Sequence, residues 1–379
     1  MKRINLKNIS SWFTNNSYIL FMVFTFLSFY FNVSGALRQV LWVLLFFLNL
    51  KYVTIRSQMD GIVLFYFFTS FLTLSGNVVI PYPPEDFLKV LIYSYVPIIF
   101  YFIGKNSVSV YPTFMNRSNI GVMFLIILGF YFLLFPTDMY ITKSLETINI
   151  HGYYTEETLG LARFASFMDS YHTANLGVCS LCFSFGLLRY SNNKIWKVLA
   201  FLFIIISVVD ILLARQRVAI YIGFFIFIYY LFFSGYGKTG TVIIVVALFG
   251  GVVYFLFNSV DILFLEQITS RFTGKATSTL FSSRTNQWIE AFEGFYQAPL
   301  LGLGVGSSGH VAYVNNPQHP IVTDGSYFKI LVEGGIISFI PFTIILILSL
   351  LKGFKYRKKY YIEFPLLFFF ACSLLGANI

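Results

Sequence analysis

Charged residues are scarce in this sequence of 379 residues: they make up only 11% of it, whereas a soluble domain has about 25%. Hydrophobic residues make up 57%, with 47 Phe and 26 Tyr among them. Such a chain cannot cover its surface with polar groups, which excludes a soluble globular protein and makes lipid the surrounding solvent. The net charge of +10 would favour nucleic-acid binding in a soluble protein. Here the net charge is explained by an unequal distribution of charged residues between the two sides of a membrane, and no nucleic-acid partner is expected.

Cysteine is also scarce, with three residues, Cys179, Cys182 and Cys372, all inside apolar runs. Cys179 and Cys182 are one helical turn apart, which is typical of a packed helix face. A metal site needs further ligands nearby, and the neighbouring sequence supplies none. The sequence therefore predicts no metal site and no cofactor.

Long apolar runs recur along the chain, and each can cross the ~30 Å hydrocarbon core of a membrane as a helix. The runs are continuous rather than alternating, which favours helices over a barrel. The sequence predicts an all-α, multi-pass membrane protein in which residues 1–379 form one transmembrane domain of about eleven helices. Because further spans follow, the first run is expected to be an uncleaved helix rather than a signal peptide. The predicted spans are 17–37, 39–55, 61–80, 87–104, 120–136, 173–188, 198–214, 218–233, 241–257, 330–351 and 364–379.

The distribution of Lys and Arg gives these spans a direction. With the N-terminus in the cytoplasm, the inside segments hold 16 basic and 2 acidic residues, and the outside segments with the adjoining span ends hold 10 basic and 14 acidic residues. Cytoplasmic segments of membrane proteins carry an excess of Lys and Arg. The sequence therefore predicts a cytoplasmic N-terminus.

Two long loops fall on the outer side in this topology, namely 137–172 and 258–328. Long loops in a compact protein are usually functional or disordered. These loops are rich in Arg, aromatic residues and Gly rather than in disorder-promoting residues. We therefore expect both loops to be folded and to carry the chemistry.

Arginine residues on the outer side are the main chemical signal, because the rule that sets the direction depletes that side of basic residues. A guanidinium group can bind a phosphate through two parallel hydrogen bonds, and a lipid-linked pyrophosphate at the outer leaflet presents that group at this depth. The alternative is a structural ion pair, since Asp210 and Arg217 are seven residues apart, two turns along one helical face. The candidate pyrophosphate-binding residues are Arg163, Arg215, Arg217 and Arg284.

The segment 285–296 in the larger loop has the pattern of an amphipathic helix. Ser283 or Thr285 is expected to cap it, and Pro299 with the following glycine run is expected to end it. The aromatic stripe is expected to lie against the membrane surface or the spans. The alternative is a platform for stacking a sugar, with Trp288 as a sugar-binding residue. The stripe consists of Trp288, Phe292, Phe295 and Tyr296.

Candidates for proton transfer follow this helix. A residue that deprotonates a sugar hydroxyl must be a His, Asp or Glu held near the acceptor. Asp324 and His319 lie just before the tenth span, and Glu333 lies inside its first turns, where an ionisable group is a functional hypothesis by default. The alternative for Asp324 is an N-cap of the tenth helix. The candidate catalytic residues are Asp324, His319 and Glu333.

These residues together resemble the O-antigen polymerase and O-antigen ligase superfamily. The resemblance rests on the order of three stretches and is supported by Arg163-Phe-Ala-Ser-Phe-x-Asp and by the turn Ala214-Arg215. The three stretches are Arg284-x3-Trp288, Pro299-Leu-Leu-Gly302-x-Gly304 and Asp324-Gly-Ser-Tyr327-x3-Leu331-x-Glu333-Gly-Gly-Ile-Ile.

The resemblance implies an inverting, metal-independent, GT-C-like glycosyltransferase that uses undecaprenyl-pyrophosphate-linked glycan as donor. It implies that Arg215 and Arg284 hold the pyrophosphate, and it adds Tyr327 as a candidate sugar-binding residue. Ligases of the family carry His where this chain has Asp324, which favours a repeat-unit polymerase and leaves His319 as an alternative base. The implied partners are lipid-linked donor and acceptor glycans, the bilayer and a chain-length regulator. The implied location is the bacterial inner (plasma) membrane, with the active site on the periplasmic face.

Two other functions stay open at this point. One is an O-antigen ligase of the same superfamily. The other is a flippase or transporter of lipid-linked sugars, although transporters often have pseudo-repeated halves and polar residues at mid-membrane, and this chain shows neither clearly.

Overall fold

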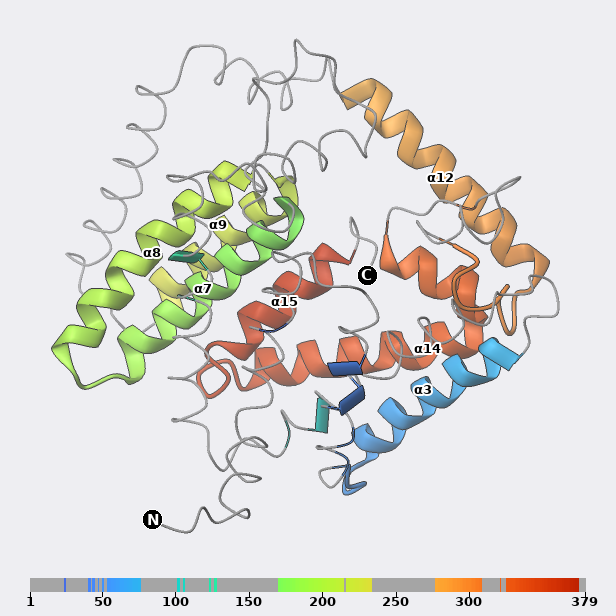
Figure 1. Cartoon of the computed structure of the whole chain (residues 1–379), viewed down its shortest axis with the longest axis horizontal. Helices are drawn as coiled ribbons and strands as arrows, with labels where there is room; N and C mark the ends of the chain where they lie inside the picture. The colour runs from blue at the N-terminus through green and yellow to red at the C-terminus, as the bar shows by residue number, and fades with distance from the viewer. Residues whose placement is uncertain are drawn as a thin grey trace.

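The computed structural model describes the helices of two packed groups and the loops beside them (Figure 1). All named elements within the described residues are α-helices. Outside these helices, the described residues Ser308 and Ile321 form an isolated parallel β-bridge. The described residues are 53–75, 170–214, 216–233, 277–308, 321 and 325–374, with 24, 40, 41, 43, 44, 47, 50, 101, 102, 105, 123, 126 and 127.

The first group is a bundle with a continuous apolar core. Its helices are α7 (Ser170–Tyr190), α8 (Lys194–Ala214), α9 (Arg217–Phe233) and α15 (Glu363–Ser373). α7 and α8 form the most extensive helix pair of the described chain, because the short connection between them makes them antiparallel neighbours. Asn193 caps α8, since its side-chain oxygen accepts the N–H of Ile195 at 2.9 Å. In the core, the fully buried Tyr230 donates a hydrogen bond to the carbonyl oxygen of Tyr361 at 3.1 Å.

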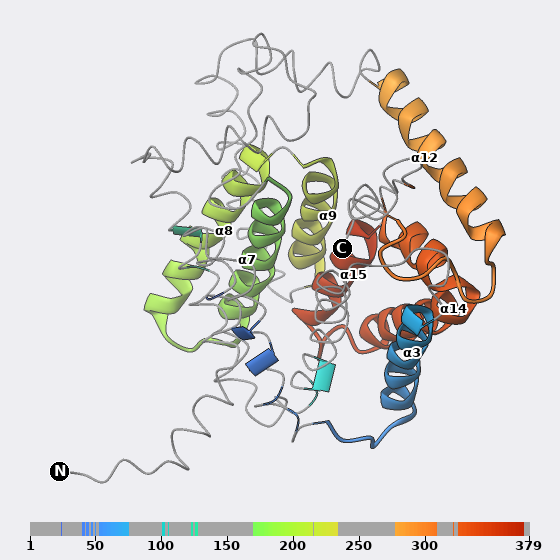
Figure 2. The same ribbon diagram turned by 45° about the vertical axis from the view of Figure 1, so that its right-hand side comes forward.

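The second group contains α3 (Gln58–Ser75), α12 (Thr277–Gln297) and α14 (Ser326–Lys355). α14 packs against both other helices and also against α15, which lies between the two groups (Figure 2). Ser338 on α14 donates a hydrogen bond to the hydroxyl of Thr69 on α3 at 3.1 Å. α14 is therefore the central element that connects the two groups.

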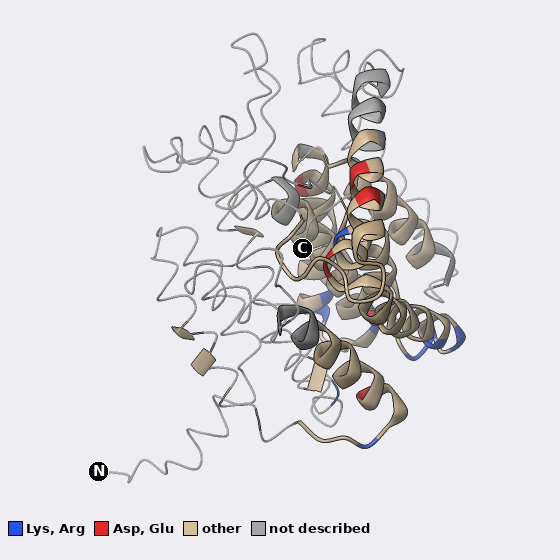
Figure 3. Cartoon of the chain, turned by 90° about the vertical axis from the view of Figure 1, so that its right-hand side faces the viewer, with Lys and Arg blue, Asp and Glu red and all other residues tan. Residues whose placement is uncertain are grey.

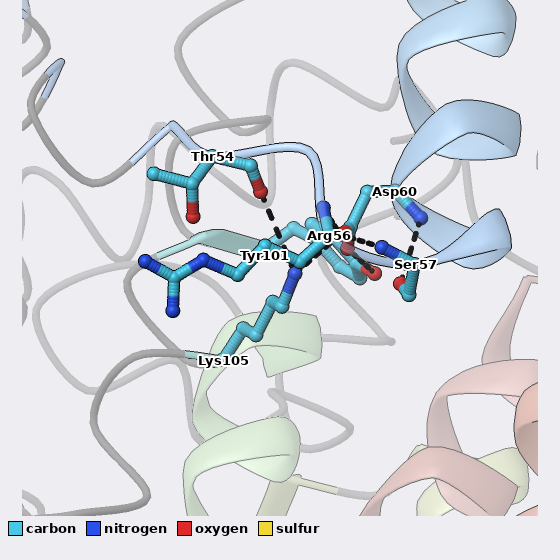
Figure 4. A network of polar contacts seen from close by, with 6 residues as sticks. All are labelled: Thr54, Arg56, Ser57, Asp60, Tyr101 and Lys105. Atoms are coloured by element: carbon cyan, nitrogen blue, oxygen red, sulfur yellow. Dashed lines mark hydrogen bonds and ion pairs between the residues drawn. The ribbon is translucent and has the colours of Figure 1, made fainter.

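A buried polar network fixes the start of α3 (Figure 4). Ser57 and Asp60 form a capping box, in which each side chain accepts the backbone N–H of the other, at 3.3 Å and 2.8 Å. The Asp60 carboxylate also accepts the N–H of Arg56 at 2.7 Å and the hydroxyl of Tyr101 at 2.9 Å, and it pairs with Lys105. Four donors thus satisfy a fully buried carboxylate, which is the condition for burying a charge without a large penalty.

Six predicted spans coincide with helices of the structure, namely α3, α7, α8, α9, α14 and α15. By length and composition, two helices among the described residues can cross a membrane: Lys194–Leu212 within α8, and α14. Val218–Tyr230 and Glu363–Ser373 are shorter apolar helices. The spans 17–37, 39–55, 87–104, 120–136 and 241–257 lie wholly or largely outside the described residues, so the number eleven stays a prediction.

Three contacts join helix ends that are far apart in the sequence. Segments that were expected on the same side meet each other, twice on the predicted inside and once on the predicted outside. The direction of the chain relative to a membrane stays a prediction from the charge distribution. The three contacts are Asp60 with Lys105, Arg189 over the ring of Tyr361 at 4.4 Å, and the N–H of Ser326 with the carbonyl of Leu374 at 2.9 Å.

Helix α12 corrects one detail of the sequence interpretation. It begins at Thr277 rather than near residue 285, so Ser283 and Thr285 lie inside the helix and are not its N-cap. The local capping signal is therefore overridden, and the helix extends two further turns toward its N-terminus. The end at Gln297, just before Pro299, agrees with the expectation.

Candidate active site

Helix α14 is broken at Gly335. The backbone there has φ 59° and ψ −165°, a conformation that is essentially confined to glycine. A Cβ atom on Gly335 would lie 2.5 Å from the carbonyl carbon of Leu300 and 2.6 Å from the nitrogen of Gly302. The prediction of one continuous span over 330–351 is therefore wrong at this position, because α14 consists of two helical pieces joined at the glycine.

The loop that follows α12 is inserted into this break. In an unbroken helix the N–H of Ile336 would bond to the carbonyl of Val332, and that of Ile337 to Glu333. All four of these backbone groups bond to the loop instead, so the break leaves none of them without a partner. The four hydrogen bonds are Leu303 N–H to Val332 O (2.8 Å), Gly304 N–H to Glu333 O (3.0 Å), Ile336 N–H to Pro299 O (2.9 Å) and Ile337 N–H to Leu300 O (3.2 Å).

This arrangement, residues 299–304 bonded to 332–337, is called here the backbone clamp. It explains why the glycines at its centre cannot carry side chains. Gly302 has φ 72°, and a Cβ on it would lie 2.5 Å from the carbonyl oxygen of Glu333. The two sequence stretches Pro299-x-x-Gly302-x-Gly304 and Glu333-Gly-Gly-Ile-Ile are therefore the two halves of one structural unit.

Glu333 is the ionisable residue of the backbone clamp, and only 7% of it is exposed. Its Oε1 atom accepts hydrogen bonds from the hydroxyl of Ser308 at 3.2 Å and from the backbone N–H of Ser308 at 3.4 Å. The backbone N–H of Gly306 is a further donor. The carboxylate also interacts electrostatically with Lys329, one turn earlier, and with Tyr66 on α3. The buried charge is thus bonded to the glycine-rich loop.

Aromatic side chains join α12 to the first piece of α14. Trp288 stacks on Phe328 with ring centroids 5.4 Å apart, and Phe292 meets the edge of the same ring at 5.6 Å. The small core beneath them contains Ala291, Leu303 and Val332. One face of Trp288 is therefore occupied by Phe328, while 37% of the residue stays exposed. Both expected roles, packing on the spans and offering a surface to a sugar, stay compatible with this position.

Tyr327 connects the start of α14 with the end of α15. Its hydroxyl donates a hydrogen bond to the carbonyl of Ala371 at 2.9 Å. The N-cap of α14 is Gly325, with φ 145° and no side-chain capping bond. Asp324 is therefore not the N-cap residue, so the structural alternative for Asp324 is wrong.

The candidate arginines are only partly described. Arg284 lies on α12, four residues before Trp288 and hence on the same face, and Arg217 is the first residue of α9. The side chains of both lie outside the described residues, as do Arg163 and Arg215 and the candidate bases His319 and Asp324. Because α8 ends at Ala214 and α9 begins at Arg217, Asp210 and Arg217 do not share one helical face, and that form of the ion-pair alternative is wrong.

Sequence reasoning missed the surroundings of two polar residues, Ser308 in the loop after α12 and Asp210 on α8. Ser308 is separated from Glu333 by 25 residues, and no local pattern pairs them. Asp210 was noted only as a partner for Arg217, yet it is 3% exposed and its Oδ2 has no hydrogen-bond partner within the described part of the chain. It packs close to α7, where a Cβ on Gly177 would lie 2.9 Å from that oxygen.

Among the described residues, no group of three or more His, Cys, Asp or Glu side chains could hold a metal ion. The acidic residues of α12, Glu290 and Glu293, are exposed on its surface (Figure 3).

Comparison with known families bears on this arrangement. Residues 202–343 match the family model described as O-antigen ligase. The match extends from α8 through α9, α12 and the backbone clamp into the second piece of α14. No curated protein matches the chain. The resemblance predicted from the sequence is thereby confirmed over residues 202–343, which are similar to the O-antigen ligase family.

Proposed function

We propose that this chain is a polymerase of lipid-linked polysaccharide repeat units. It transfers a growing glycan from undecaprenyl pyrophosphate to the terminal hydroxyl of another lipid-linked repeat unit. The match of residues 202–343 to the O-antigen ligase family carries this proposal. The matched segment contains Arg215, Arg284 and Glu333 and both halves of the backbone clamp, so it contains most of the candidate site.

The proposed reaction is an inverting substitution at an anomeric carbon. The acceptor hydroxyl oxygen attacks this carbon, and the bond to the pyrophosphate oxygen breaks. The pyrophosphate lipid leaves with the electron pair, and Arg215 and Arg284 stabilise the charge that develops on it. Asp324 or His319 removes the proton of the hydroxyl. The step needs no nucleotide sugar and is proposed to be independent of metal.

The other predicted residues have supporting roles in this proposal. Arg163 and Arg217 complete the pyrophosphate site. Trp288 stacks on Phe328 of α14, and the hydroxyl of Tyr327 bonds to the carbonyl of Ala371 on α15; both residues are proposed to contact the glycan. The chemistry is assigned to the periplasmic face of a bacterial inner membrane, with the N-terminus in the cytoplasm and a chain-length regulator as a partner protein.

An O-antigen ligase is the second candidate function, and the description of the matched family favours it. A ligase transfers a finished glycan to a different acceptor, whereas a polymerase adds repeat units. Asp324 stands where ligases of the family carry His, which supports the polymerase.

A deletion strain tests the proposal. Loss of this chain should leave surface glycan with a single repeat unit, seen as loss of the ladder on an electrophoresis gel. Wholly unmodified lipid A–core would indicate a ligase instead. Accumulation of lipid-linked repeats in the inner leaflet would indicate a flippase.

Complementation of that strain tests the site. Arg284→Ala should not restore chain extension, although the protein is present in the membrane at its normal level. Arg357→Ala is the matched control, because it removes an arginine from the turn after α14, on the predicted opposite side, and should restore the ladder. A normal ladder with Arg284→Ala would overturn the site assignment.

A further inference from the structure

We infer that Glu333 is a positioning residue, which fixes the loop at residues 304–308 and, through Ser308, Ile321, a position between the candidate bases His319 and Asp324 in the sequence, rather than meeting the sugar hydroxyl itself. The inference rests on the proposed function, because it assigns a role within that reaction. It concerns a group that was predicted from its position in the tenth span and from the resemblance. The observation that carries it is the set of hydrogen bonds between Glu333 and the loop.

The backbone and the side chain of Glu333 bind the same loop at different points. Its carbonyl oxygen accepts the N–H of Gly304 at 3.0 Å. Its carboxylate accepts the hydroxyl and N–H of Ser308 at 3.2 Å and 3.4 Å, with the N–H of Gly306 as a further donor. One residue therefore fixes the loop from residue 304 to residue 308.

The glycine conformations make this fit possible. Gly302, Gly304 and Gly306 have positive φ values of 72°, 99° and 85°, a conformation that residues with a Cβ rarely adopt. In this loop the N–H groups of Gly306 and Ser308 are donated to the Glu333 carboxylate, and the N–H of Gly304 is donated to the Glu333 carbonyl.

Ser308 extends this restraint to Ile321, which lies between the two candidate bases in the sequence. It forms a parallel β-bridge with Ile321, so the two ends of the segment 309–320 are brought together. In the sequence, His319 precedes Ile321 by two positions and Asp324 follows it by three. On the far side, the N–H of Ser326 is bonded to the carbonyl of Leu374 at 2.9 Å. The anchors at Ser308, Ile321 and Ser326 therefore lie on both sides of the two candidates in the sequence.

The carboxylate itself is poorly placed to reach a glycan. It is buried, it is bonded to the loop, and it has Lys329 and Tyr66 as electrostatic neighbours from α14 and α3. A general base must lie within hydrogen-bond reach of the proton that it removes. A group that is occupied by its own loop suits a fixed anchor better than a base.

Substitution of Glu333 in the purified full-length protein separates these roles. Glu333→Gln keeps an acceptor oxygen of the same reach, so kcat for repeat-unit transfer should fall by less than about tenfold. Glu333→Asp shortens the side chain and Glu333→Ala removes the acceptor, and a misplaced base costs about a hundredfold. Glu290→Gln is the matched control, since this exposed residue of α12 should leave kcat unchanged. The pH at which kcat rises should be the same in Glu333→Gln and wild type, because the base is another residue.

The opposite result would overturn the inference. If Glu333 is the base, Glu333→Gln should lose about 10²–10⁴-fold in kcat and should abolish the rise of kcat with pH, while the protein stays folded. Loss of activity in Glu333→Ala could also come from misfolding. Glu333→Gln avoids this ambiguity, because it retains the hydrogen-bond acceptor that holds the loop.

Amide hydrogen exchange gives a readout that does not depend on activity. Peptides covering residues 303–308 should exchange faster in Glu333→Ala and in Ser308→Ala than in wild type, and Glu333→Gln should resemble wild type. If wild type shows this protection but transfers no repeat unit, the proposed function fails and the anchoring stands. If wild type is active and Glu333→Ala leaves exchange unchanged, the inference fails and the proposed function stands.

Discussion

Replacement of Gly335 by Ala tests the backbone clamp directly. The Gly335 backbone has φ 59° and ψ −165°, and a residue with a Cβ pays about 1–3 kcal/mol in this region. The new Cβ would also lie 2.5 Å from the carbonyl carbon of Leu300 and 2.6 Å from the nitrogen of Gly302. These neighbours are backbone atoms, so the loop itself has to move away from α14.

Movement of the loop breaks hydrogen bonds of the backbone clamp. Each such bond contributes about 0.5–1.5 kcal/mol net, and loss of two of the four therefore costs about 1–3 kcal/mol. With the backbone strain, Gly335→Ala should lower the free energy of unfolding by about 2–6 kcal/mol. If the other two hydrogen bonds of the backbone clamp also break, the loss of unfolding free energy is larger.

The measurement is thermal unfolding of the purified protein in detergent, followed by the loss of monodisperse protein at one fixed heating rate. The apparent midpoint should fall by at least about 3 °C. Gly61→Ala is the matched control, because a Cβ at Gly61 on α3 has no neighbour within 4 Å and Ala is the better helix former. Its midpoint should be unchanged or slightly higher. Equal midpoints for Gly335→Ala and wild type would refute the account of the break.

Three further substitutions test other parts of the structure. Asp60→Asn should lower the thermal midpoint more than Lys105→Met, because the Asp60 carboxylate accepts from four donors and Lys105 supplies one of them; the reverse order would contradict this account of the network. Tyr230→Phe should cost about 1 kcal/mol of unfolding free energy, because the carbonyl of Tyr361 loses this donor at 3.1 Å, and an unchanged denaturation curve would show that the bond contributes nothing. Arg215→Lys should impair chain extension in the complemented strain, because an ammonium cannot form the bidentate fork; a full ladder would show that a point charge is sufficient.

The sequence predicted the helical elements well where the signal was local. Apolar runs located α7, α8, α9 and α15 closely, because a helix in lipid needs a long run of apolar residues and little else. The aromatic pattern located the C-terminal half of α12, although not its start at Thr277. The order of the predicted spans put Arg189 and Tyr361 on one side, and the structure has them in contact; the direction given by charge counting stays a prediction.

The candidate site was predictable as a set of motifs but not as an arrangement. Resemblance indicated Glu333 and the glycine stretches, and it gave no reason for the glycines. The bond between Glu333 and Ser308 spans 25 residues, and no periodic pattern connects residues at that distance. Trp288 was predicted to lie against the membrane surface or the spans, with sugar stacking as the alternative, and the structure adds that Phe328 covers one of its faces.

Composition and the continuous apolar runs by themselves predicted a helical membrane protein, since lipid leaves the backbone few ways to satisfy its polar groups. These sequence features could not show that four backbone groups of α14 would form hydrogen bonds with another segment instead of within the helix. Only the tertiary structure decided that the break at Gly335 is filled by residues 299–304. The physical reason is that hydropathy records which side chains avoid water, whereas the pairing of distant backbone groups depends on how the helices pack.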